Sequence, residues 1–325
     1  MHRLRSADGV PVWLVVREAE VRAGLVDRRL GADRAHAACP TGFALPAVLE
    51  GHPLNRDGAD HARLRRFAAP EFTVRWADTR RARVEYVAAR LAADLLAHRR
   101  TDLVARFAIP LPLTVTADLL GVPHRRRAEL ARHTHTMLTH THPEQLHNAV
   151  CHVHRLLADL ISIRRRLPGG DVLSAWTTRR DRHRTIGEDE LLALAFQLWW
   201  AGIENTAHVI TRGTHLLLDH PDQARALRAA PALLPAAIEE ILRHCAPTAI
   251  ATRHAREDLT IAGTPVPAGG TVVLALASAH HGPARRTHLA LAVPPHRLRR
   301  RTSLRLDGMY SLPVTLTAPS SGGPW

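Results

Sequence analysis

The sequence feature that most constrains the fold is a succession of long segments rich in Ala, Leu and Arg, in which apolar residues recur with a helical period of about 3.6 residues. Helices are expected over residues 60–68, 76–98, 111–120, 125–139, 145–166, 189–218, 222–229 and 231–244. Asp171 is placed as the N-cap of a further helix, and Thr185 with Glu188 has the pattern of a capping box before the longest segment. The pattern predicts a mainly α-helical fold.

A small β portion is expected near both ends of this helical run. Residues 10–16 are rich in β-branched side chains and predict a strand, which is followed by a helix over 18–27. Residues 259–261 and 271–276 predict two further short strands. Because neither an internal repeat nor a linker-like stretch divides the chain, a single domain over residues 1–325 is expected.

The charge limits the classes of partner. A formal net charge of +14 is compatible with nucleic-acid binding, but no nucleic-acid-binding motif and no mixture of basic with aromatic residues accompanies it. We therefore expect no nucleic-acid partner, and the favoured use of the basic surface is docking of an acidic redox protein.

Cysteine usage and hydropathy indicate the compartment. The three cysteines, Cys39, Cys151 and Cys245, show no paired spacing, which favours a reducing compartment and no disulfide framework. The longest apolar stretch, residues 191–203, is too short to cross a bilayer. A cytoplasmic location without membrane contact is expected.

Two pairs of charged residues have helical spacing. In residues 54–66, His61 and Arg65 are four apart and share one helix face. Glu240 and Arg243 are three apart, which brings a carboxylate and a guanidinium together. Taken singly, both pairs are also typical of solvated helix surfaces.

Three further motifs occur in order along the chain. Residues 201–206 read Ala-Gly-Ile-Glu-Asn-Thr inside the long apolar helix, and residues 253–269 begin Arg-His-Ala-Arg-Glu-Asp and end Pro-Ala-Gly. Residues 288–298 then read His-Leu-Ala-Leu-Ala-Val-Pro-Pro-His-Arg-Leu. In order and spacing, these motifs and the two charged pairs resemble those of the bacterial cytochrome P450 family.

The resemblance implies a helical prism around a haem b cofactor. Members of the family oxidise a small organic substrate with O₂ and with electrons from ferredoxin and ferredoxin reductase. The substrate pocket is implied to lie between the loop at 38–53 and a lid at 125–165. The implied propionate-binding residues are His61, Arg65, Arg253 and His296, and the implied structural pair is Glu240 with Arg243.

For the long helix, the resemblance implies a role in oxygen activation. Ala201 and Gly202 are implied to let the helix pass close to the haem, and Glu204 to relay protons together with a neighbouring alcohol. Asn205 occupies the alcohol position, and Thr206 follows one residue later. An amide binds water but is a poor proton donor, so this relay is expected to be weakened.

Residue 298 departs from the family pattern. The family loop reads approximately H-L-A-F-G-x-G-P-H-R-C, and Leu298 stands where its cysteine supplies the thiolate ligand of iron. No residue of the loop is therefore expected to bind the metal. By comparison with the family pattern, the meander between His281 and His288 is nearly deleted and the helix after Leu298 is missing. We therefore expect a prism truncated on its proximal side, with residues 281–325 forming a degenerate meander, haem loop and C-terminal strands.

These departures leave several functional classes open. The chain is a haem monooxygenase by resemblance, and Leu298 predicts that it is inactive as written. The alternatives are a non-catalytic auxiliary protein that recruits a partner enzyme, for example a biosynthetic glycosyltransferase, and the product of a decayed pseudogene.

A histidine-rich stretch suggests a metal site as another possibility. Its members are His133, His135, His140, His142, His147, His152 and His154. Their irregular spacing does not match a structural zinc site, which favours surface histidines over metal ligands.

Overall fold

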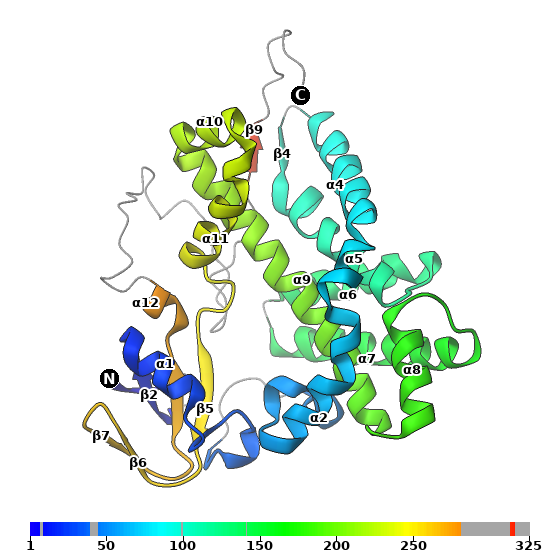
Figure 1. Cartoon of the computed structure of the whole chain (residues 1–325). Helices are drawn as coiled ribbons and strands as arrows, with labels where there is room; N and C mark the ends of the chain where they lie inside the picture. The colour runs from blue at the N-terminus through cyan, green and yellow to red at the C-terminus, as the bar shows by residue number, and fades with distance from the viewer. Residues whose placement is uncertain (7–8, 40–44, 99, 141, 281–312, 316–325) are drawn as a thin grey trace.

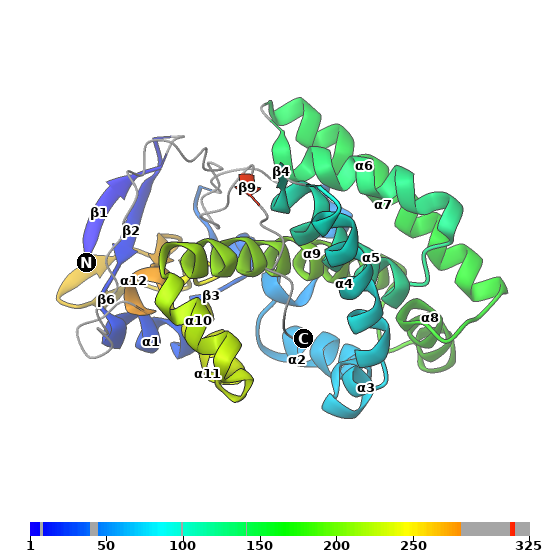
Figure 2. The same cartoon turned by 90° about the horizontal axis from the view of Figure 1, so that it is seen from above.

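One long helix, α9 (Glu188–Asp219), runs through the middle of the molecule, with the main sheet on one side and α6, α7 and α8 on the other (Figures 1 and 2). The computed structural model describes residues 1–6, 9–39, 45–98, 100–140, 142–280 and 313–315. The mainly helical fold with a small β portion is confirmed. The remaining α-helices are α1 (Glu18–Val26), α2 (Gly58–Ala68), α3 (Val74–Asp78), α4 (Arg81–Leu96), α5 (Pro110–Leu119), α6 (His124–Thr139), α7 (Pro143–Arg166), α8 (Val172–His183), α10 (Pro221–Ala229), α11 (Leu234–His244) and α12 (Leu276–His280).

The ends of α9 follow from local chemistry. Its N-cap is Gly187, whose N–H donates to the Glu190 carboxylate over 2.7 Å, and three acidic residues in the first turn complement the helix dipole. The expected capping box at Thr185 and Glu188 is therefore wrong by two residues, because Glu190 is the acid that reaches back. At the other end, Pro221 begins α10 and prevents α9 from continuing.

The main sheet joins strands from both ends of the described chain. Its order is β1-β2-β8-β5-β3, with β2 and β8 parallel and the other neighbours antiparallel. These strands are β1 (His2–Arg5), β2 (Pro11–Val15), β3 (Leu30–Gly31), β5 (Ala251–Ala255) and β8 (Thr271–Leu274). Two-stranded sheets pair β6 (Leu259–Ile261) with β7 (Thr264–Val266), and β4 (Arg100–Asp102) with β9 (Pro313–Thr315).

The apolar core has two main parts. The larger surrounds the N-terminal half of α9 and includes Trp176 and Trp199, both at most 1% exposed, together with Leu64 of α2. The smaller lies under the main sheet and includes Trp13 of β2 and Ala255 of β5. Each large side chain buried in this way contributes about 1.5–3 kcal/mol. Helix α2 and strand β5 thus belong to different cores.

One expected helix needs correction, and some short elements were not predicted. The helix expected over 76–98 is divided into α3 and α4, because the Thr79 hydroxyl donates to the Trp76 carbonyl over 2.6 Å and closes a local turn. The short strand β4 and the π-helix at Val104–Ala108 were not predicted. Across the described ranges, no helix is both long and apolar enough to cross a membrane.

Candidate functional site

Helix α2 carries the first pair of predicted site residues. His61 is half-buried, and its Nδ1–H donates to the Pro53 carbonyl over 2.8 Å. This bond leaves the Nε2 edge of the ring available. Arg65, one turn later, is exposed, and within the described part of the chain neither side chain forms a salt bridge. The pair can therefore present donors to an anion.

Strand β5 carries the next predicted residue, Arg253. It lies in the middle of the sheet, opposite Val272 of β8, and is half-buried. Burial lowers the pKa of Arg253, while the nearby Asp57 carboxylate opposes that change. Among the described residues, its guanidinium donates only to the Thr252 carbonyl, at 2.9 Å, and forms no salt bridge. A partly desolvated guanidinium without a carboxylate contact favours an external anion, and the residues present thus fit a haem propionate.

The residues of the α9 motif differ in how deeply they are buried. Ile203 and Ala207 are buried, whereas Ala201 and Asn205 lie on a face that is only half covered. Thr206 is exposed, and because successive helical residues are about 100° apart it cannot take the direction of Asn205. Glu204 is half-buried.

Gly202 has a packing role that the sequence did not reveal. A Cβ atom added there would lie 2.9 Å from Oγ1 and 3.5 Å from Cγ2 of Thr116 in α5. The glycine therefore permits the close crossing of α9 and α5. Its small size is needed for helix packing whether or not the helix also approaches a cofactor.

The predicted pair Glu240 and Arg243 forms within α11. Arg243 donates to Glu240 twice, from Nε to Oε2 over 2.7 Å and from Nη2 to Oε1 over 2.5 Å. It also donates from Nη1 to the His280 carbonyl at the end of α12 over 2.8 Å. The third contact of the arginine is thus a backbone atom. His296 and Leu298 lie outside the described residues.

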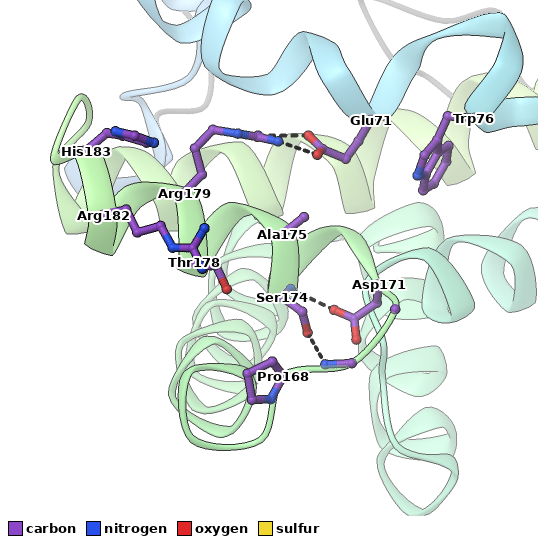
Figure 3. Close-up of a pocket in the computed structure, with 12 residues that line it drawn as sticks. Glu71, Trp76, Pro168, Asp171, Ser174, Ala175, Thr178, Arg179, Arg182 and His183 are labelled. Atoms are coloured by element: carbon purple, nitrogen blue, oxygen red, sulfur yellow. Dashed lines mark hydrogen bonds and ion pairs between the residues drawn. The ribbon is translucent and has the colours of Figure 1, made fainter.

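A described cavity lies away from these residues. It has a volume of about 490 Å³ and is lined by Glu71, by Trp76 of α3, by the loop at 168–171 and by one side of α8 as far as His183 (Figure 3). Its acids are already engaged, because Glu71 accepts from Arg179 and Asp171 caps α8 through the Ser174 N–H. None of the predicted site residues lines it.

The histidine-rich stretch lies on α6 and α7 and on the short connection between them, which contains His140 and His142. The rings of His133 and His152 stack with centroids 4.3 Å apart, and burial lowers the pKa of His133. Within the described ranges, no group of three or more His, Cys, Asp or Glu side chains is arranged to hold a metal ion.

Comparison with known proteins identifies relatives over most of the chain. Residues 104–285 match the family model for cytochrome P450. The chain is 37% identical to cytochrome P450 monooxygenase PikC of Streptomyces venezuelae, over 98% of this chain and 76% of PikC. It is also 37% identical to 6-deoxyerythronolide B hydroxylase of Saccharopolyspora erythraea, over 85% of this chain and 71% of the hydroxylase. The solved structure of tirandamycin C-bound P450 monooxygenase TamI superposes with a TM-score of 0.85 at 32% identity, over 97% and 94% of the two chains.

Proposed function

Because the chain belongs to the cytochrome P450 family, we propose that it binds haem b and a small organic molecule of secondary metabolism, but has little or no monooxygenase activity. When bound through a thiolate, haem supplies the activation of O₂. Leu298 stands where the family pattern has the cysteine that provides this ligand. We further propose that residues 1–325 form a single domain.

The observation that carries the proposal is the state of Arg253. Its half-buried guanidinium has a carbonyl as its described partner and no carboxylate within salt-bridge distance among the described residues. A charge held in that state is stabilised by an anion, which a haem propionate would provide. His61 and Arg65 would bind in the same way, with His296 as a further donor.

On α9, Ala201 would leave room beside the cofactor, and Asn205 would hold water on the half-covered face. Since an amide does not readily give up a proton, Glu204 would be the main proton donor of the helix. If electrons are accepted at all, we expect them to come from ferredoxin and ferredoxin reductase.

A second function is favoured by Leu298 alone. A chain that keeps the scaffold without the iron ligand is suited to a non-catalytic role, in which it recruits or stabilises a partner enzyme such as a glycosyltransferase. Loss of haem binding together with stable co-purification of such an enzyme would favour this role. A chain with neither property would fit a decayed pseudogene product.

The test is reconstitution of the full chain with haem, followed by reduction and addition of carbon monoxide. We expect bound haem whose spectrum lacks the red-shifted Soret band of a thiolate-ligated iron. Leu298→Cys should restore part of that band, whereas Leu291→Cys, a matched change in the same loop, should not. A thiolate-type band in the unaltered protein, or hydroxylation of a substrate with reductase supplied, would refute the proposed loss of activity.

A further inference from the structure

Asp57 joins three segments of the chain that are distant in sequence. Its Oδ1 accepts from Ala32 N over 2.9 Å, and its Oδ2 accepts from Asp33 N over 3.0 Å. Arg256, just after β5, places Nη2 2.9 Å from the same Oδ2. Asp57 is also the residue before α2, and its carbonyl accepts from His61 N over 3.3 Å. One residue therefore links the start of α2, the loop after β3 and the end of β5.

The packing around Gly31 shows how closely these groups converge. A Cβ atom on Gly31 would lie 2.7 Å from Asp57 Oδ2, 2.7 Å from His36 Cδ2 and 2.8 Å from Arg256 Nε. No other residue leaves room for all three. The Asp57 side chain is 22% exposed, so it is held between protein groups and is not free in solvent.

The charges of the cluster are assigned to separate partners. Asp33 accepts from Arg56 over 3.0 Å, and Asp57 is paired with Arg256. Arg253, three residues earlier on β5, forms a salt bridge to neither acid. The Asp57 carboxylate attracts Arg253 without contacting it, and this attraction opposes the lowering of the Arg253 pKa by burial. Asp57 therefore fixes the strand end while leaving the Arg253 guanidinium available.

We propose that Asp57 is a positioning residue that fixes the relative position of two anion-binding arms. One arm is His61 with Arg65 on α2, and the other is Arg253 on β5. The inference rests on the proposed function, in which these arms bind the two propionates of one haem. The arms belong to different apolar cores, so packing within one core does not fix their relation. Groups that recognise one ligand must be held to within about 0.5 Å, and supporting hydrogen bonds provide that precision.

The test uses the full chain and two probes that need no iron ligand: protoporphyrin IX, which carries both propionates, and its dimethyl ester, which carries neither charge. Affinity for each is measured by fluorescence titration. The unaltered protein should prefer the free acid. Asp57→Asn should reduce that preference by about tenfold, since it weakens hydrogen bonds to a charged group. Arg253→Gln should reduce the preference similarly. The double variant should lose no more of the preference than the single variant with the larger loss.

The chain offers a closely matched control in Asp27. Its side chain is 23% exposed, lies 2.7 Å from an arginine, Arg29, and accepts the Arg29 N–H over 2.9 Å, but it contacts neither arm. Asp27→Asn should leave the preference unchanged. If Asp57→Asn does not fold, Arg256→Gln releases β5 from the same carboxylate without altering the residue before α2, and should give the same reduction.

The outcomes separate the two proposals. Equal loss of affinity for both probes would show a purely structural role for Asp57 and overturn the inference. Additive losses in the double variant would also overturn it, because Asp57 would then act independently of Arg253. If the unaltered protein prefers the acid and Asp57→Asn keeps this preference, only the inference is overturned. No preference in the unaltered protein would reject the propionate arms themselves, and the inference with them.

Discussion

Gly202→Ala tests whether helix packing explains the glycine in α9. Replacing Gly by Ala inside a helix stabilises it by about 1 kcal/mol. The new methyl group would lie 2.9 Å from Thr116 Oγ1, and Thr116 is stiff because it is β-branched and only 2% exposed. Overpacking of this kind costs about 1–3 kcal/mol, so we expect a net loss of about 1 kcal/mol. In a Thr116→Ala background the clash is absent, and the same change should stabilise by about 1 kcal/mol.

The assay is urea unfolding of the four proteins followed by far-UV circular dichroism. The decisive result is that Gly202→Ala lowers the free energy of unfolding in the unaltered background and raises it in the Thr116→Ala background. This difference corresponds to a coupling free energy of about 2 kcal/mol. Gly213 in the same helix is the control, since its added Cβ would lie 2.9 Å from Cγ2 of Ile241, and Thr116→Ala should not rescue Gly213→Ala. If Gly202→Ala destabilises equally in both backgrounds, contact with Thr116 is not the reason for the glycine.

Two further predictions concern ion pairs around α2 and α8. Arg63 hydrogen-bonds to Glu190 and holds the pKa of that carboxyl below its usual 4.5, so the stabilisation is present above about pH 4.5 and is lost as pH falls through the lowered pKa. Unfolding free energies of the unaltered protein and Glu190→Gln should therefore converge as the pH falls below about 4.5, and a constant difference would contradict this. Glu71 is 7% exposed and accepts from Arg179 over 2.9 Å and from Trp176 Nε1 over 3.0 Å. Glu71→Gln should cost about 2 kcal/mol, less than a fully buried pair because the arginine is partly exposed, and an unchanged urea midpoint would refute it.

Much of the helical fold can be predicted because its determinants are local. The bounds of α2, α5, α6 and α7 lie within two residues of the expected segments, since amphipathic periodicity and end signals act within a few turns. Asp171 caps α8 as expected. Strand β4 was missed because it has three residues, and its partner β9 lies at the other end of the chain. So short a strand has no periodicity of its own.

In the candidate site, too, local contacts can be predicted from the sequence and long-range contacts cannot. Pairs within one helix, such as Glu240 with Arg243, follow from spacing. The contact of Asp57 with Arg256 joins segments far apart in the sequence, and no local pattern indicates it. Asp57 lies in the motif at 54–66 that also contains His61. Its position directly before a helix, where Asp is a preferred N-cap residue, is the signal that could have identified it as a structural residue.

Arg243 makes a long-range contact that does not depend on a particular side chain. It donates to the His280 carbonyl, which any residue at position 280 would supply. Lysine cannot reproduce three donors in a planar fork, so Arg243→Lys should cost about 1–2 kcal/mol, reduced because Glu240 is 42% exposed. Arg225→Lys is the matched control: Arg225 pairs with Asp222 at the same i,i+3 spacing but is 67% exposed, and should cost less than about 0.5 kcal/mol. Equal losses in urea unfolding would mean that the bond from α11 to α12 contributes nothing measurable.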